Sequence, residues 1–152
     1  WVVTLDALAP FRVPAPIQDP PVLEYLQETQ RLGIDLQLEV ELATSTAGGT
    51  IISQVNFSEM YWTMAQQLAH VTSNGTPVQA GDLYASGTVS GAGDGSFGSL
   101  IELTRNGAEP IALPNGERRT FLEDGDTVTL RGSCGGGDRP GISLGEVTGT
   151  VG

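Results

Sequence analysis

Few side chains in this sequence have the type and spacing that catalysis or metal binding requires. His70 is the only histidine, and it could serve as a general base or as a metal ligand. No serine, cysteine or second histidine is placed near it, so a packing or helix-capping role is favoured. Asp124-Gly125-Asp126 could be part of a calcium loop, but the alternate ligands and the closing glutamate of an EF-hand are missing, which favours a tight turn. Cys134 is the only cysteine and can form neither an internal disulfide nor a zinc-binding thiolate cluster.

Glu102 is the carboxylate that stands out, because it lies in an apolar segment, 99–105, that we expect to form a strand. A carboxylate on a half-buried strand is costly unless it is paired, and this would indicate a functional partner. Alternatively, the face of the strand that carries Glu102 is simply the solvent-exposed one. The residues alone leave both interpretations open.

A glycine-rich stretch, 91–98, could bind phosphate through its backbone N–H groups. However, the Gly-Lys-Ser/Thr continuation of a P-loop is absent. The sequence contains no lysine at all, which also excludes a Schiff base and a lysine general base. We therefore expect 91–98 to be a loop that is mobile or that another segment approaches closely.

The strongly acidic composition restricts the possible partners. The 152-residue chain has seven arginines against 18 aspartates and glutamates, and its net charge of −11 argues against binding nucleic acid or an anionic membrane surface. No apolar run approaches the ~20 residues that span a bilayer. The first residues lack the basic region of a signal peptide, and the single cysteine favours a reducing compartment, so we expect a cytoplasmic location.

The elements that must position these side chains are mainly short strands, because 21 glycines and 9 prolines punctuate the chain. Strict alternation of apolar and polar residues predicts a strand at 34–42, with an acidic solvent face that discourages edge pairing with another chain. Its antiparallel partner is expected at 50–55. The only convincing helix is predicted at 57–73, with Asn56 as its cap and Glu59 reaching back to the cap backbone. Further strands are expected at 83–89, 110–113, 118–122, 127–132 and 142–151, which makes one mainly β domain.

Several unusual strings of residues occur together, in one order, and carry a family resemblance. They include Trp1-Val2-Val3-Thr4-Leu5-Asp6, Gln18-Asp19-Pro20, Met60-Tyr61-Trp62-Thr63-Met64, Gly81-Asp82-Leu83, Ala85-Ser86-Gly87-Thr88 and Phe97-Gly98-Ser99. Over essentially its whole length the chain resembles the fumarylacetoacetate hydrolase family. The resemblance implies a mixed β-sandwich roll in which residues 1–152 form the C-terminal part of the catalytic domain. The N-terminal portion, with the metal ligands and the base, is expected to be absent from this chain.

The resemblance also implies a reaction, the hydrolysis of the C–C bond of 4-fumarylacetoacetate to fumarate and acetoacetate in the breakdown of tyrosine and phenylalanine. In this family a divalent cation, Ca²⁺ or Mg²⁺, holds the diketo acid substrate, and a histidine activates water for attack on a carbonyl. Members of the family form homodimers. This chain is therefore expected to supply one wall of the site and to be inactive alone.

Three positions receive a role from the resemblance, residue by residue. Thr88, in the string Ser-Gly-Thr, is implied to contact substrate, and Gly87 beside it is implied to allow a close approach of the backbone. Glu102, in the string Phe-Gly-Ser-x-x-Glu, is implied to orient the catalytic histidine, which needs a fixed tautomer to act as a base. No metal ligand is assigned in this chain. The alternative hypothesis is a non-catalytic β-rich module, derived from the family, that serves binding or assembly.

Overall fold

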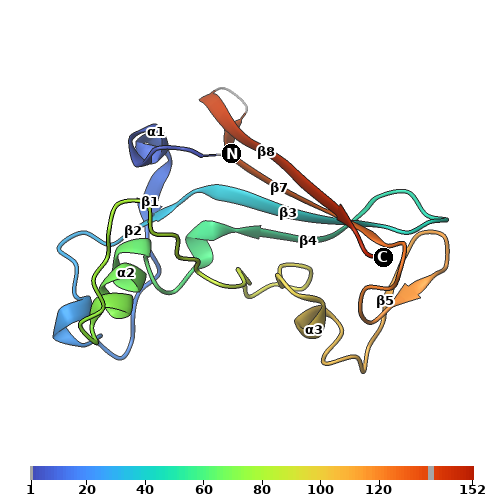
Figure 1. Cartoon of the computed structure of the whole chain (residues 1–152), viewed down its shortest axis with the longest axis horizontal. Helices are drawn as coiled ribbons and strands as arrows, with labels where there is room; N and C mark the ends of the chain where they lie inside the picture. Colours follow the sequence, from blue (N-terminus) through green and yellow to red (C-terminus); the bar gives the residue numbers. More distant parts are fainter. Residues whose placement is uncertain (1, 137–138) are drawn as a thin grey trace.

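A four-stranded antiparallel sheet is the largest sheet of the described residues (Figure 1). The structure is a computed structural model, and it describes residues 2–136 and 139–152. In spatial order, the strands of the sheet are β4 (Thr50–Asn56), β3 (Leu36–Ala43), β7 (Thr127–Gly136) and β8 (Arg139–Thr150). Two short antiparallel pairs are β1 (Arg12–Pro14) with β2 (Leu32–Ile34), and β5 (Ile111–Ala112) with β6 (Arg118–Arg119). This arrangement confirms the expected mainly β fold class.

The strand predicted at 34–42 is confirmed as the end of β2 followed by β3, and its alternation explains its place in the sheet. Leu42 has 0% of its surface exposed, whereas Gln37 on the opposite face is exposed. β3 pairs with β4, as predicted, and also with β7. β3 thus has a neighbouring strand on both sides within this chain. The expectation that its acidic face discourages edge pairing with another chain stays a prediction.

A single arginine balances the acidic face of the sheet. Arg131 in β7 donates hydrogen bonds to Glu39 at 3.3 Å and to Glu41 at 2.7 Å, both in β3. It also donates to Glu146 in β8 at 3.1 Å. Pairs of opposite charge on neighbouring strands stabilise a sheet, and the fork of five N–H donors on a guanidinium can serve three carboxylates at once. Arg131 therefore joins three strands.

The helix predicted at 57–73 is in fact two separate elements. The 3-10 turn η3 (Phe57–Glu59) ends at Met60, whose backbone has a ψ of 124°, and α2 (Met64–Thr72) begins afresh. The side chain of Thr63 accepts the N–H of Gln66, and the side chain of Gln66 accepts the N–H of Thr63. This reciprocal capping box makes Thr63 the N-cap of a new helix. The apolar residues that recur at helical spacing over 57–71 therefore do not lie on one continuous helix.

The other helical elements are short. They are α1 (Leu5–Leu8), η1 (Ala9–Phe11), η2 (Glu24–Leu26) and α3 (Leu100–Leu103). Asn56, the expected cap of the long helix, caps η3 instead by accepting the N–H of Ser58 at 2.9 Å. Among the described residues, no helix has the length and apolar character that crossing a bilayer requires.

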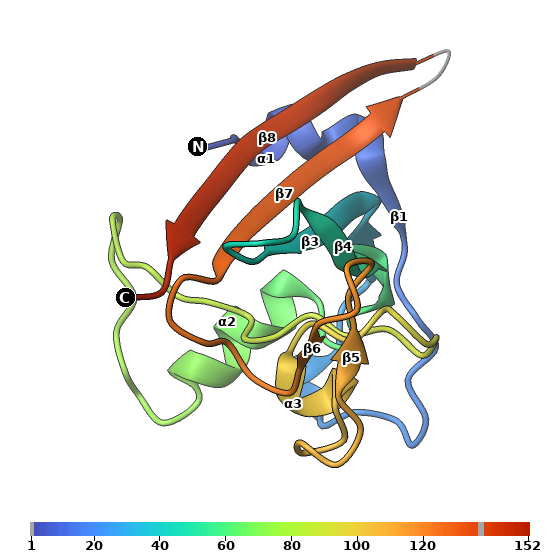
Figure 2. The same cartoon turned by 90° about the vertical axis from the view of Figure 1, so that its right-hand side faces the viewer.

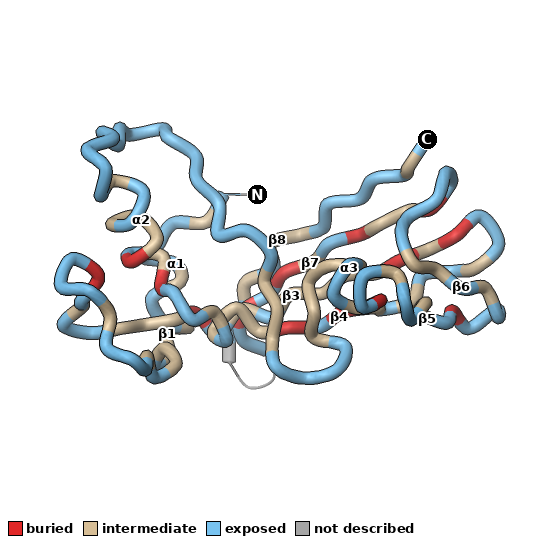
Figure 3. The backbone as a smooth tube through the Cα atoms, turned by 90° about the horizontal axis from the view of Figure 1, so that it is seen from below, coloured by how far each residue is buried: buried red, intermediate tan, exposed pale blue. Residues whose placement is uncertain are grey.

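Residues 73–88, which follow α2, are all exposed to solvent (Figure 3). The strand predicted at 83–89 does not form, because no strand of the described residues lies beside it to pair with its N–H and C=O groups. The predicted strands at 110–113 and 118–122 shorten to β5 and β6, while those at 127–132 and 142–151 are confirmed within β7 and β8. Trp1, with which the first family string opens, lies outside the described residues.

The helices α2 and α3 and the β5–β6 hairpin lie on one side of the large sheet (Figures 1 and 2). The apolar core is small. Its buried apolar members among the described residues are Leu26, Ile34, Leu42, Val55, Leu113 and Cys134. With so few buried apolar side chains, polar contacts also hold the segments of the fold together.

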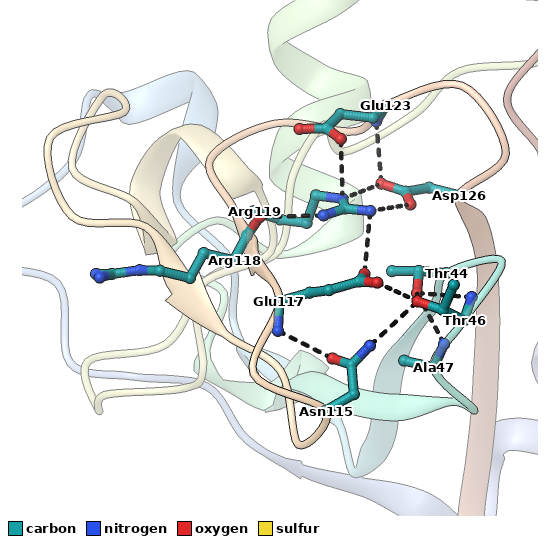
Figure 4. A network of polar contacts seen from close by, with 9 residues as sticks. All are labelled: Thr44, Thr46, Ala47, Asn115, Glu117, Arg118, Arg119, Glu123 and Asp126. Atoms are coloured by element: carbon teal, nitrogen blue, oxygen red, sulfur yellow. Dashed lines mark hydrogen bonds and ion pairs between the residues drawn. The ribbon is translucent and has the colours of Figure 1, made fainter.

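One such contact network centres on Arg119 in β6 (Figure 4). Its guanidinium donates to both carboxylate oxygens of Asp126, at 2.9 and 3.1 Å, and Asp126 is only 1% exposed. Asp126 also accepts the N–H of Glu123 at 3.0 Å, which closes the tight turn that the sequence predicted here. On its other side Arg119 pairs with Glu117, which accepts a hydrogen bond from Thr46. The hydrogen bonds from Arg119 hold the pKa of the Asp126 carboxyl below its usual value.

Candidate functional site

Glu102 lies on a helix, so the strand predicted at 99–105 is wrong. The N–H of Leu103 bonds to the carbonyl of Ser99 at 3.0 Å, and the N–H of Thr104 bonds to that of Leu100 at 2.8 Å. Leu100, Leu103 and Thr104 are covered, whereas Ile101 and Glu102 are exposed. Covered positions that recur three and four residues apart fit the period of a helix and not that of a strand.

The position of Glu102 settles the choice between a buried and a solvent-facing carboxylate. Its side chain is exposed, so no burial has to be compensated. The carboxylate is nevertheless held in place, because Oε2 accepts a hydrogen bond from Ser99 Oγ at 2.6 Å and another from Ser90 Oγ at 2.9 Å. Glu102 is thus an accessible carboxylate with one fixed oxygen.

Thr88 and Gly87 end the exposed stretch that follows α2. Gly87 has a φ of +78°, a conformation that side chains disfavour, and an added Cβ would meet none of the described atoms within 4 Å. The glycine at this position therefore supplies a backbone conformation, and the close approach that the resemblance implied for it stays a prediction. Within the described residues, a close approach occurs at Gly98, where a Cβ would lie 2.2 Å from the carbonyl oxygen of Val89 and 2.8 Å from a methyl carbon of Thr88.

The glycine-rich stretch 91–98 is anchored from two directions. The N–H of Ala92 bonds to the carboxylate of Glu59 at 3.2 Å, and the N–H of Gln54 in β4 bonds to the carbonyl of Gly95 at 2.9 Å. The prediction that Glu59 reaches back to the cap of its own helical turn is therefore wrong. Its carboxylate supports this loop instead. The expectation of a closely approached loop is confirmed, because a Cβ on Gly91 would lie 2.4 Å from Glu59 Oε2.

Thr88 and Glu102 line one open cleft of about 550 Å³. Ser90 and Ser99 lie in the same lining, and so does the aromatic pair Tyr61–Trp62. The two rings meet edge to face, with their centroids 5.0 Å apart. The cleft can offer a substrate a hydroxyl, an accessible carboxylate and an apolar aromatic wall, while Gly87 does not line it.

The sequence did not predict the contacts of Ser90, Ser99 and Glu59. Ser90 and Glu59 acquire theirs from segments that are more distant in sequence, whereas Ser99 carries one local signal. Ser99-x-x-Glu102 has the pattern of a capping box. In the structure, however, the hydroxyl of Ser99 bonds to the side chain of Glu102 and not to its backbone N–H.

His70 and Cys134, the other reactive residue types, lie apart from this cleft. His70 Nδ1 is 3.0 Å from the hydroxyl of Tyr25, and the two rings stack with centroids 6.4 Å apart. Cys134 is buried, and burial raises the pKa of its thiol, which disfavours the reactive thiolate. Neither contributes a base or nucleophile to the cleft.

A metal centre also has to be considered. Within residues 2–136 and 139–152, no three His, Cys, Asp or Glu side chains gather into a group that could hold a metal ion. The described residues therefore do not by themselves fit the cation that the resemblance implies.

Comparison with known proteins gives consistent results. The model of the family described as fumarylacetoacetate (FAA) hydrolase C-terminal matches residues 1–152. Over 152 residues the chain is 49% identical to a fumarylacetoacetase of Arabidopsis thaliana and 46% identical to one of Homo sapiens. Each alignment covers 99% of this chain and 36% of the relative. The chain thus spans about a third of the length of these relatives.

Proposed function

The chain belongs to the fumarylacetoacetate hydrolase family, and from this premise we propose that it is part of an enzyme that hydrolyses the C–C bond of 4-fumarylacetoacetate to fumarate and acetoacetate. One observation carries the proposal. Thr88 and Glu102, which belong to separate segments, line the same cleft. These are the positions to which the family strings assign substrate contact and orientation of the base.

In this proposal, Glu102 accepts a hydrogen bond from the imidazole of a histidine in another part of the protein. That bond fixes the tautomer of the ring, so that its second nitrogen can remove a proton from the attacking water. The hydroxyl of Thr88 contacts the diketo acid, and the positive φ of Gly87 allows the chain to turn into the cleft at this point. Tyr61 and Trp62 provide the apolar wall.

A divalent cation, Ca²⁺ or Mg²⁺, belongs to the same proposal. When bound, it supplies Lewis-acid binding of the diketo oxygens. Its ligands are proposed to come from other parts of the protein, because the described residues bring no suitable group together. We also propose a homodimer in the cytoplasm; the single cysteine and the acidic composition are consistent with this location.

The test is turnover of 4-fumarylacetoacetate by a full-length protein that carries this sequence, with Glu102→Gln as the variant. Turnover is expected to fall about 100-fold or more, because the amide cannot stabilise the imidazolium that forms. Cation affinity is expected to stay unchanged. Glu109→Gln is the matched control, since Glu109 is an exposed carboxylate that pairs with Arg105 at 3.2 Å. Full activity of Glu102→Gln would contradict the role of Glu102, and a wild-type protein without turnover would favour the non-catalytic module.

A further inference from the structure

We propose that Ser90 and Ser99 are positioning residues that hold Glu102 by one oxygen, Oε2, and keep the other, Oε1, available for the imidazole of the base. This inference rests on the proposed function and deepens it. It concerns how an exposed glutamate on a four-residue helix is kept in one orientation. Three side-chain torsions of Glu102 would otherwise be free.

The two hydroxyls converge on the same atom. Ser99 Oγ lies 2.6 Å from Glu102 Oε2, and Ser90 Oγ lies 2.9 Å from it. Oε1 of Glu102 accepts no hydrogen bond from residues 2–136 and 139–152. A carboxylate fixed through one oxygen keeps the full acceptor capacity of the other.

The hydroxyl of Ser90 has its direction set by a third group. The N–H of Gly98 donates to Ser90 Oγ at 3.0 Å, which occupies a lone pair of that oxygen. The O–H bond of Ser90 is then directed toward Glu102. Hydrogen bonds linked in this way, from Gly98 through Ser90 to Glu102, strengthen one another.

The two serines flank the glycine-rich stretch 91–98, one at each end. Ser99 is the N-cap residue of α3, and its extended backbone places its side chain beside Glu102, three residues further on. Ser90 precedes the stretch, in which the N–H of Gly91 bonds to the carbonyl of Ser96 at 2.9 Å. Because both ends of this anchored stretch supply a donor, two side chains hold the carboxylate instead of one.

The test is a set of kinetic double-mutant cycles in the full-length protein with 4-fumarylacetoacetate. Ser90→Ala and Ser99→Ala are each expected to lower kcat about 10-fold, the lower end of what removing an orienting hydrogen bond costs. KM is expected to change less than twofold, because neither serine is assigned to substrate binding. Neither substitution should lower kcat further in a Glu102→Gln background, where the positioned carboxylate is already lost.

Two controls separate positioning from general damage to the fold. Ser96→Ala removes a hydroxyl of the same loop that bonds to the carbonyl of Gly93 and does not touch Glu102, so kcat should stay within twofold of the wild type. Ser99→Thr keeps the hydroxyl and should restore kcat. The melting temperature of each variant shows whether it is folded.

The outcomes discriminate clearly. Unchanged kcat in both alanine variants would overturn the inference, as would an equal loss of kcat in the presence and absence of the Glu102 carboxylate. Loss of kcat that Ser99→Thr fails to restore would overturn it for Ser99. If the wild-type protein does not turn over the substrate, the proposed function itself fails, and this result is distinct from a failure of the coupling.

Discussion

Replacing Gly98 by alanine is expected to force apart two chain segments that meet at the candidate site. The added Cβ would lie 2.2 Å from the carbonyl oxygen of Val89, and a backbone atom cannot rotate away as a side chain can. Restoring ordinary van der Waals contact requires the segments to separate by about 1 Å. The hydrogen bond from the Gly98 N–H to Ser90 Oγ, now 3.0 Å, would then be lost.

The magnitude follows from these two effects. Overpacking of this kind costs about 1–3 kcal/mol, and a lost hydrogen bond costs about 0.5–1.5 kcal/mol. Gly98→Ala should therefore lower the free energy of unfolding by about 1.5–4.5 kcal/mol. Because Ser90 then no longer directs its hydroxyl at Glu102, kcat of the full-length protein should fall at least ~10-fold.

Urea unfolding followed by circular dichroism measures the stability change, and Gly48→Ala is the matched control. A Cβ at Gly48 would meet none of the described atoms within 4 Å, and its φ lies outside the left-handed region. Its substitution should change the free energy of unfolding by less than about 1 kcal/mol, with a slight gain expected. Equal urea midpoints for the two variants would refute the reasoning, because the contact at Gly98 would then carry no cost.

Three further predictions concern stability. Asp126→Asn should lower the free energy of unfolding by about 2–3 kcal/mol at pH 7 in urea, because a buried partner of Arg119 is lost. Since Arg119 lowers the pKa of Asp126, the stabilisation by the ionised Asp126 carboxylate is present at neutral pH and is lost as the pH falls below about 4. The urea midpoints of wild type and variant should therefore converge between pH 7 and pH 3. Leu42→Ala should cost about 2–5 kcal/mol in the same assay, and an unchanged midpoint would contradict its place in the core. Thr63→Ala should cost about 1 kcal/mol and speed amide hydrogen exchange in the first turn of α2; slower exchange there would contradict the cap.

Sequence reasoning succeeded where a local pattern decides the structure. The alternation over 34–42 predicted β3 and its antiparallel partner, because one face of this strand is buried and the other is not. It failed where two local patterns compete. Apolar spacing favoured one helix over 57–73, but the reciprocal cap at Thr63 and Gln66 starts the helix seven residues later, at Met64.

The candidate site was less predictable than the sheet. Residue types alone left Glu102 as an unexplained carboxylate, and only the family strings gave roles to it and to Thr88, which stay predictions. The segment 99–105 is too short for its apolar residues to distinguish a strand from a helix. The contacts of Ser90 and Gly98 with their neighbours depend on how distant segments meet, which no local pattern encodes.

The exposed stretch 73–88 has a consequence for how this protein can diversify. None of its residues is buried, so insertions and deletions within it remove no core packing and alter closure entropy only slightly. Yet it ends at Thr88, on the rim of the cleft. The length of its first part, 73–80, can therefore vary while the sheet keeps its stability, whereas its second part, 81–88, carries the family strings that lead to the proposed substrate contact at Thr88.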